Sequence, residues 1–139
     1  MNDPFDLQRF VDAQNPVFEQ VIRELAHGRK ESHWMWFVFP QLKGLGSSPM
    51  AERFGITSRA EAEAYLAHTI LGPRLLECTR RVNSVQGRSI EQILGGIDAL
   101  KFRSSMTLFA EINRSSGVFR DALTKYYAGE SDPLTLARL

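Results

Sequence analysis

Cysteine is almost missing from the sequence, and its scarcity excludes a scaffold held together by disulfides. Cys78 is the single cysteine among 139 residues, so no intrachain disulfide can form. A chain of this length buries roughly two thirds of its unfolded surface on folding, which suffices without cross-links or a structural metal. We therefore expect one domain, residues 1–139, in a reducing cytoplasm, with Cys78 as a small buried apolar side chain.

The chain also lacks an excess of charge of either sign. It holds 17 Lys and Arg against 16 Asp and Glu, a formal net charge of +1. Proteins that bind nucleic acid or membrane surfaces through charge carry a stronger positive balance, so we expect neither partner. One locally basic segment is interpreted as a solvated helix face that pairs with acids such as Glu77; it contains Arg74, Arg80, Arg81 and Arg88.

Long hydrophobic runs are missing as well. The longest extends from Trp34 to Phe39, far short of the ~20 residues that cross a bilayer. The first segment, MNDPFDLQRF, has neither the basic nor the apolar region of a signal peptide. We therefore expect no membrane span and no secretory leader.

Established catalytic and metal-binding motifs are absent too. His27, His33 and His68 are scattered, and none belongs to an H-E-x-x-H or Cys–His pattern. There is no G-x-S-x-G nucleophile motif, and Glu77 and Glu111 are isolated carboxylates. The sequence therefore predicts no metal and no cofactor, and it leaves open whether the protein is an enzyme.

Helix start and stop signals, by contrast, recur along the whole chain. Capping boxes begin at Ser58 and Ser89, and Ser48-Pro49 is typical of a helix start. Between these signals apolar residues recur at intervals of three and four, and no segment alternates as a strand would. We predict an all-α single compact domain of about seven or eight short helices, which are too interrupted for a simple four-helix bundle.

Several helix boundaries follow from the same signals. Ser32 is expected to cap a helix that begins at the next residue, and Ser116 to cap the last long helix. Gly95-Gly96 is expected to end a helix early, although Ile97 continues the apolar pattern of that helix. Asp98 is then expected to cap the helix that follows.

The aromatic segment from His33 to Gln41, HWMWFVFPQ, is the first candidate site. One interpretation is a central core helix, because a helix that is apolar on all sides is normally buried. The other is that one edge of this helix lines a ligand pocket. The indole N–H groups of Trp34 and Trp36 need partners when buried, and polar His33 and Gln41 bracket the aromatic run.

The loop that follows is the second candidate. Its glycines allow close backbone approach, and its hydroxyls and the next helix start offer hydrogen-bond donors to an anion. The same residues also suit a tight turn before an ordinary Ser-Pro helix start, and both interpretations stay open. The candidate residues are Lys43, Gly44, Gly46, Ser47 and Ser48.

The third candidate is the stretch LKFRSSMTLF. Lys101 and Arg103 stand near the expected start of a helix, where cations are mildly unfavourable unless they meet an anion or a carboxylate. Pairing with surface acids, or simple exposure to solvent, explains them equally well. Ser104 and Ser105 complete this candidate set, and both are also typical of close helix–helix contacts.

Three stretches of the sequence resemble a family of small bacterial proteins of unassigned function. They are RKESHWMWFVFPQLKGLGSSPMAERFGI, AYLAHTILGPRLLECT and LKFRSSMTLFA. The family is marked by an S-H-W-M-W-[FY]-[IV]-F-P-Q-[LI]-x-G-L-G-x-S motif, and the resemblance covers nearly the whole chain. It implies an all-helical fold and no activity. Some members are labelled "calpastatin", but calpastatin itself is an extended, disordered chain, unlike this apolar-rich sequence.

Three functions are consistent with these features. The first is the binding of a small anionic or aromatic ligand between the segment from His33 to Gln41 and the turn from Lys101 to Ser105. The second is a protein–protein interaction module with an exposed Trp/Phe surface. The third is an enzyme acting on a nucleotide or ADP-ribose-like substrate, with His33 as its proton-transfer group. The sequence does not indicate the oligomeric state.

Overall fold

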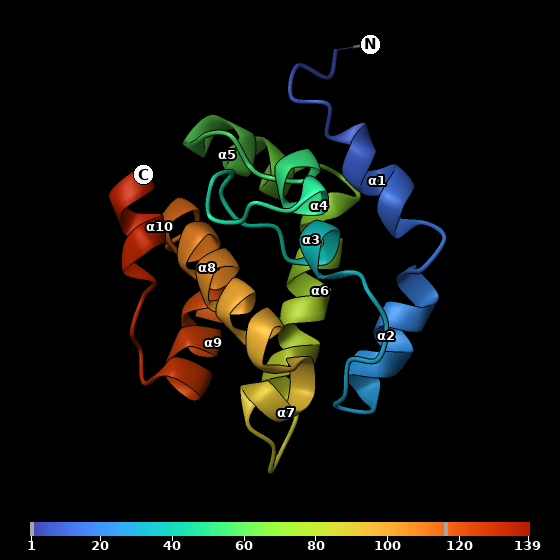
Figure 1. Cartoon of the computed structure of the whole chain (residues 1–139), viewed down its shortest axis with the longest axis vertical. Helices are drawn as coiled ribbons and strands as arrows, with labels where there is room; N and C mark the ends of the chain where they lie inside the picture. Colours follow the sequence, from blue (N-terminus) through green and yellow to red (C-terminus); the bar gives the residue numbers. More distant parts are fainter. Residues whose placement is uncertain (1, 116) are drawn as a thin grey trace.

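The computed structural model describes residues 2–115 and 117–139, which form ten helices and no β-sheet (Figure 1). The predicted all-α class is confirmed, and short α3, α4 and α7 raise the number of helices above the expected seven or eight. The expected cap at Ser116 lies outside the described residues. The helices are α1 (Gln8–Gln14), α2 (Phe18–Ala26), α3 (Met35–Val38), α4 (Pro49–Arg53), α5 (Arg59–Ala67), α6 (Leu71–Ser84), α7 (Ile90–Leu94), α8 (Gly96–Ile112), α9 (Gly117–Tyr127) and α10 (Pro133–Arg138).

Two long helices, α6 and α8, organise the packing. Helix α6 contacts α2, α5 and α9, whereas α8 contacts α5, α7, α9 and α10. Leu75, Cys78, Thr79 and Val82 of α6 are buried, which confirms the burial expected for Cys78. No helix among the described residues is long and apolar enough to cross a membrane.

Aromatic rings connect four helices through the core. Phe10 of α1 meets Tyr65 of α5 edge to face at 5.1 Å between ring centroids. Tyr65 then contacts Phe109 of α8 at 5.6 Å, and Phe109 contacts Phe119 of α9 at 5.7 Å. All four rings are fully buried. Such pairs add about 0.5–1.5 kcal/mol each beyond the area that they bury, so helices from both halves of the chain are tied together.

The segment before α3 departs from its predicted structure. The expected cap, Ser32, donates its hydroxyl to the Glu24 carboxylate at 2.6 Å instead of capping a helix. Helix α3 therefore begins at Met35, after Trp34 has turned its indole into the core and donated Nε1 to Glu24 at 2.9 Å. The loop after α3 is held by a parallel β-bridge between Leu42 and Ile56.

At the junction of α7 and α8, one expectation is confirmed and two are corrected. The predicted break is confirmed, since α7 ends at Leu94 and α8 starts at Gly96, with Gly95 as its N-cap. Asp98 is therefore not a cap: it lies in the first turn of α8 and pairs with Lys30 at 2.9 Å. Ile97 is 75% exposed instead of buried, because the backbone at Gly95 redirects the chain and the apolar faces of α7 and α8 do not continue one another.

Polar contacts fasten residues 130–132 onto α8, and we call this set of contacts the C-terminal clasp. Arg103 donates Nε to the Glu130 carbonyl at 3.1 Å and a terminal nitrogen to the Ser131 carbonyl at 3.0 Å. Asp132 accepts from the Ser104 hydroxyl at 3.1 Å. Asp132 also caps α10, so the clasp fixes that helix beside α8.

Candidate functional site

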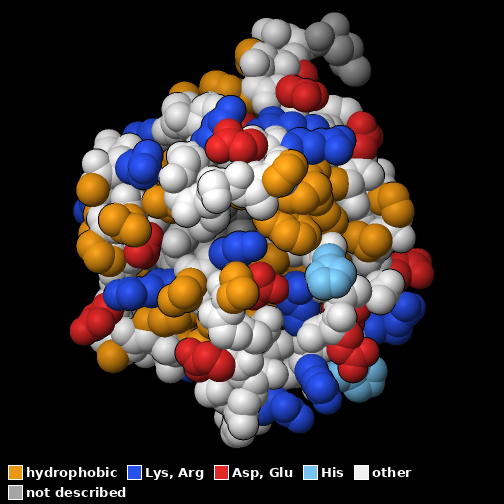
Figure 2. Space-filling view, viewed as in Figure 1, with side chains coloured by type: hydrophobic (Ala, Val, Ile, Leu, Met, Phe, Trp, Pro, Cys, Tyr) orange, Lys and Arg blue, Asp and Glu red, His pale blue; other side chains and the backbone are white. Residues whose placement is uncertain are grey.

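Three adjoining hollows share Lys101 as a common lining residue, and we call them together the Lys101 groove. Lys101 lies in the second turn of α8, one turn further from the helix start than the sequence suggested. Figure 2 shows hydrophobic side chains and a basic side chain around a hollow near the centre of one face of the molecule. The groove joins the first and third candidate stretches through Trp36, Gln41 and Lys101, and it includes one residue of the second, Gly46.

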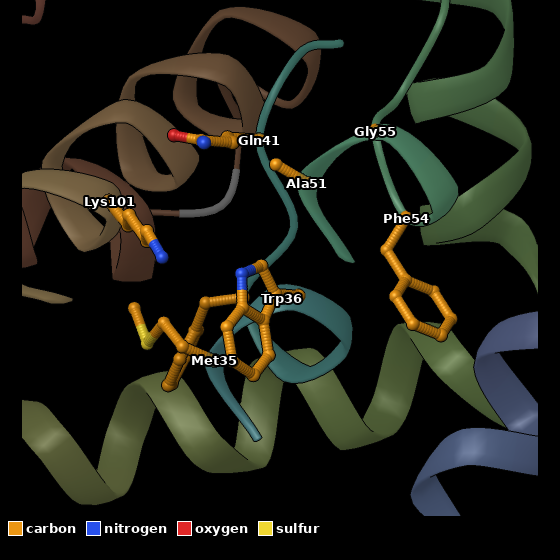
Figure 3. A pocket seen from close by; sticks show the side chains of 8 residues that line it. Met35, Trp36, Gln41, Ala51, Phe54, Gly55 and Lys101 are labelled. Atoms are coloured by element: carbon orange, nitrogen blue, oxygen red, sulfur yellow. The ribbon is translucent and has the colours of Figure 1, made fainter. Parts of the chain in front are cut away.

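The inner hollow lies between α3, α4 and α8, and its walls are mostly apolar (Figure 3). It has room for about one water-sized group, about 10 Å³. The Lys101 ammonium lies 4.9 Å from the centre of the Trp36 ring, a cation–π contact. Trp36 Nε1 is buried and has no hydrogen-bond partner among residues 2–115 and 117–139. Figure 3 shows the Lys101 nitrogen and this indole nitrogen facing the same space.

A second hollow, of about 440 Å³, extends from Lys101 towards His33. His33 is exposed at its rim. Lys30 also lines this hollow, but its ammonium is 2.9 Å from Asp98 and 5.1 Å from the centre of the Trp34 ring. Because the Lys30 side chain is only 8% exposed and already paired, Lys101 is the better placed of the two cations to meet a ligand.

The third hollow, of about 350 Å³, extends from Lys101 in the opposite sense along α8. Gln41 and Gly46 contribute to one wall, and the C-terminal clasp forms another. Its remaining lining is aliphatic: Leu45, Ile97, Leu100 and Leu134.

The charge of Lys101 is only weakly compensated by other groups. Its nearest carboxylate oxygen belongs to Asp98 at 3.9 Å, and that carboxylate already pairs with Lys30 at 2.9 Å. The guanidinium of Arg103, in contrast, serves the clasp and also approaches Glu130 at 3.7 Å. Arg103 and Ser104 therefore line the groove with their polar atoms engaged in folding contacts.

Two candidate residues are placed in the core. Trp34 is 1% exposed, with its indole N–H bonded to Glu24, so its ring is not available to stack on a ligand. Ser105 is fully buried on α8, and its hydroxyl has no hydrogen-bond partner in the described part of the chain. For the aromatic segment, the two interpretations therefore apply to different residues, since Trp34 belongs to the core and Trp36 to the edge of a hollow.

The loop candidates divide between the groove and other surfaces. Lys43 faces a different hollow and has the Glu52 carboxylate at 3.9 Å. Gly44, with φ of +96°, lies against Arg138, and Ser47 is exposed. Ser48 accepts from the amide of Ala51, so the predicted Ser-Pro helix start is confirmed and this hydroxyl caps its own helix. Of the five loop candidates, only Gly46 lines the groove.

Sequence reasoning missed the aliphatic part of the groove. Ile97 had been assigned to a buried face, while Leu100 and Leu134 stood in short segments without a periodic signal. Exposed leucines of this kind become visible only when α8 and α10 are placed side by side. Lys30 was missed because nothing in its local sequence indicates that it pairs with Asp98.

Cys78 and the scattered carboxylates offer no alternative centre. Burial, with a smaller contribution from Glu77, raises the pKa of the Cys78 thiol to about 12, so the nucleophilic thiolate is not formed at neutral pH. Within residues 2–115 and 117–139, no three His, Cys, Asp or Glu side chains are grouped so that they could hold a metal ion.

Comparisons with known proteins agree with this fold. The chain is similar to the crystallised conserved hypothetical protein Rv1873 from Mycobacterium tuberculosis, with 61% sequence identity and a TM-score of 0.97 over 99% of this chain and 98% of that chain. No curated protein matches it. The model of a family described as "Protein of unknown function (DUF1810)" matches residues 4–139. These descriptions carry no activity and do not mention calpastatin. The chain therefore belongs to the DUF1810 family, whose function is unknown.

Proposed function

We propose that the protein binds a small anionic ligand in the Lys101 groove. The observation that carries the proposal is the pair of hydrogen-bond donors at the inner hollow: the ammonium of Lys101 and the unpartnered N–H of Trp36. A buried donor without a partner costs about 1–3 kcal/mol, so an acceptor that fills the inner hollow recovers this energy. An anionic oxygen matches both donors, and its contact with the ammonium is a charge-assisted hydrogen bond.

An anionic ligand is supported better than an aromatic one that stacks on the indoles. The ring of Trp34 is enclosed in the core, and the ring of Trp36 already has the Lys101 ammonium near its face. The inner hollow accepts a group of about the size of one oxygen atom. The charged end of the ligand is therefore assigned to the inner hollow, and the rest of the ligand to the wider hollows on either side.

The two other functions receive less support. An interaction module was expected to expose Trp and Phe, whereas the large exposed hydrophobic residues in the described part of the chain are Ile and Leu. An enzyme that used His33 would need a further reacting group beside it, and the hollow at His33 adds only cations, an already paired Asp98 and apolar side chains. For location, we propose a bacterial cytoplasm, in line with the single buried thiol of Cys78.

A thermal-denaturation screen with small carboxylates, phosphates and sulfates tests the proposal. A ligand at a hundredfold excess over its Kd stabilises the native state by about 2.7 kcal/mol, which is a shift of several degrees for a domain of this size. We expect Lys101→Met to weaken binding of the hit about tenfold or more, because a hydrogen bond to a charged group contributes ~1.5–3 kcal/mol.

Lys43→Met is the matched control. Lys43 also has one carboxylate oxygen at 3.9 Å, but it lies outside the groove. We expect this variant to bind the hit as the wild type does. Equal weakening in the two lysine variants, or stabilisation by none of the anions, would overturn the proposed function.

A further inference from the structure

The most exposed large hydrophobic side chains of the described residues converge on one place. Ile97, Leu100 and Leu134 are 75%, 68% and 65% exposed, more than any other large apolar residue described. All three line the third hollow of the groove, although they come from two different helices, α8 and α10. A single exposed leucine is unremarkable, but three that share one hollow beside a cation form an amphipathic surface.

This aliphatic surface adjoins the inner hollow, which Lys101 also lines. Lys101 and Gln41 line both the inner hollow and the third hollow, so the two spaces meet at these residues. From the inner hollow outwards, a ligand would meet first the two hydrogen-bond donors and then a hollow with four aliphatic side chains, where the polar groups of the C-terminal clasp already bond one another. The volume of the third hollow, about 350 Å³, falls within the range of small-molecule sites.

We infer that the ligand class of this groove is the aliphatic carboxylate, with its carboxylate at Lys101 and Trp36 Nε1 and its alkyl chain along Ile97, Leu100 and Leu134. This inference rests on the proposed function and specifies it. The argument for an alkyl tail is that the third hollow adds no cation free of the C-terminal clasp and no aromatic side chain. A tail with further negative charges would find no additional unengaged cation there, and a nucleobase would find no ring on which to stack, whereas an alkyl chain covers the three exposed side chains.

A chain-length series tests the assignment. Butanoate, hexanoate, octanoate and decanoate are titrated below their micellar concentrations, and binding is measured by calorimetry. We expect affinity to increase about two- to fourfold per added methylene, since full burial of one CH₂ is worth ~0.8 kcal/mol and this groove is partly open. Octanol, which has the tail without the charge, is expected to bind at least tenfold more weakly than octanoate.

Two leucines of α10 provide a matched pair of variants. Leu134 lines the groove, whereas Leu136 is also exposed but is not part of it. Leu134→Ser is expected to weaken octanoate about fivefold and to leave butanoate unchanged, and Leu136→Ser to change neither. Both residues are exposed, so neither substitution removes core packing.

The possible outcomes separate the two proposals. If short anions bind and depend on Lys101, but affinity is independent of chain length, the aliphatic assignment is wrong and the anion site stands. If octanol binds as tightly as octanoate, the anion site fails. Equal effects of the two leucine variants on octanoate binding place the alkyl chain elsewhere. If no carboxylate binds, and a protein segment binds to the wild type but not to Leu134→Ser, the surface is a protein contact instead.

Discussion

At the scale of single residues, the buried carboxylate of Glu24 organises the entry to the aromatic segment. It accepts from the backbone amides of Glu31 and Ser32, from the Ser32 hydroxyl and from Trp34 Nε1, at distances of 2.6–3.0 Å. Burial alone raises the pKa of this carboxyl, but the hydrogen bonds from Ser32, Glu31 and Trp34 outweigh burial and lower the pKa from 4.5 to about 2. Glu24 therefore acts as a permanently charged acceptor at neutral pH.

We predict that Glu24 makes stability fall with acid. Because its pKa is lower in the folded protein, its contribution is complete above pH 4.5 and is lost as the pH falls towards 2. The pKa difference corresponds to about 3 kcal/mol at pH 7. Glu24→Gln should lower the unfolding free energy by about 2–3 kcal/mol at pH 7 and by less than half as much at pH 3, measured by urea denaturation.

Glu63→Gln on α5 is the control for this substitution. Glu63 is exposed, so its replacement should change the unfolding free energy by less than about 0.5 kcal/mol at either pH. A loss of stability in Glu24→Gln that is the same at pH 7 and pH 3 would show that charge is not the cause.

The same residue explains why the sequence could not distinguish Trp34 from Trp36. Both indoles stand in one aromatic run, and the pattern of the run predicts burial for each. Only Trp34 reaches Glu24, which comes from the preceding helix and had no local signal as a partner. Trp36 is left with a buried N–H that no described residue accepts.

At the scale of helices, the step from α7 to α8 depends on two adjacent glycines with different roles. Gly95 has φ of +91° and ψ of +158°, a conformation that is essentially confined to glycine. Gly96 is the first residue of α8, and a Cβ at that position would meet no atom within 4 Å. The first glycine is therefore required by the backbone, and the second is not.

Alanine substitutions should separate these roles. Gly95→Ala is expected to lower the unfolding free energy by about 1–3 kcal/mol through backbone strain. Gly96→Ala is expected to raise it by about 0.4–1 kcal/mol, because alanine restricts the unfolded chain and fits the helix. Urea denaturation of both variants measures the two signs, and effects of the same sign would contradict the backbone conformation at Gly95.

The helix start signals in the sequence correctly predicted the N-caps that depend only on neighbouring residues. Ser48, Ser58 and Ser89 cap their helices as expected, because each hydroxyl reaches an amide three residues ahead without help from distant residues. Of the two predicted capping boxes, the one at Ser89 is confirmed and the one at Ser58 is wrong, because the Glu61 carboxylate accepts from Thr57 and Arg9 instead. Ser32 and Asp98 failed as predicted caps because other residues hold their side chains: Glu24 of α2 and Lys30 of the loop after α2, respectively. A tertiary partner thus overrides a local signal where the two compete.

At the scale of the whole molecule, the C-terminal clasp decides whether α10 lies against α8. Asp132 is its central side chain: it accepts from the Ser104 hydroxyl and from both the amide and the hydroxyl of Thr135. The clasp thereby connects α10 to α8 through polar contacts, while Leu134 of the same helix stays exposed above the groove.

Asp132→Ala should release α10 without unfolding the core. We expect a loss of about 1–2 kcal/mol from the missing cap and faster hydrogen exchange in residues 133–139, with amides of α6 and α8 unchanged relative to the global stability. Asp121→Ala on the exposed side of α9 serves as the control. Unchanged exchange in α10 would show that apolar contacts, and not Asp132, hold the helix.

The groove is the feature that sequence reasoning could only partly anticipate. Gln41, Lys101 and Trp36 were expected to meet and do so around the inner hollow. The joining of α10 to this region, and with it Leu134, depends on contacts of Arg103, whose local sequence suggested ligand binding instead. Packing between such distant segments produces no periodic pattern of apolar residues in the sequence of either segment.

The composition of the groove also has a consequence for how the protein is made. Its walls come from residues within 30–55, from residues within 94–104 and from Asp132 and Leu134. A nascent chain thus has no finished groove until residue 134 has left the ribosome, and a fragment that stops before Asp132 lacks the clasp as well. Since a ligand stabilises only the conformation that binds it, protection from proteolysis by ligand would be confined to chains that extend past Leu134.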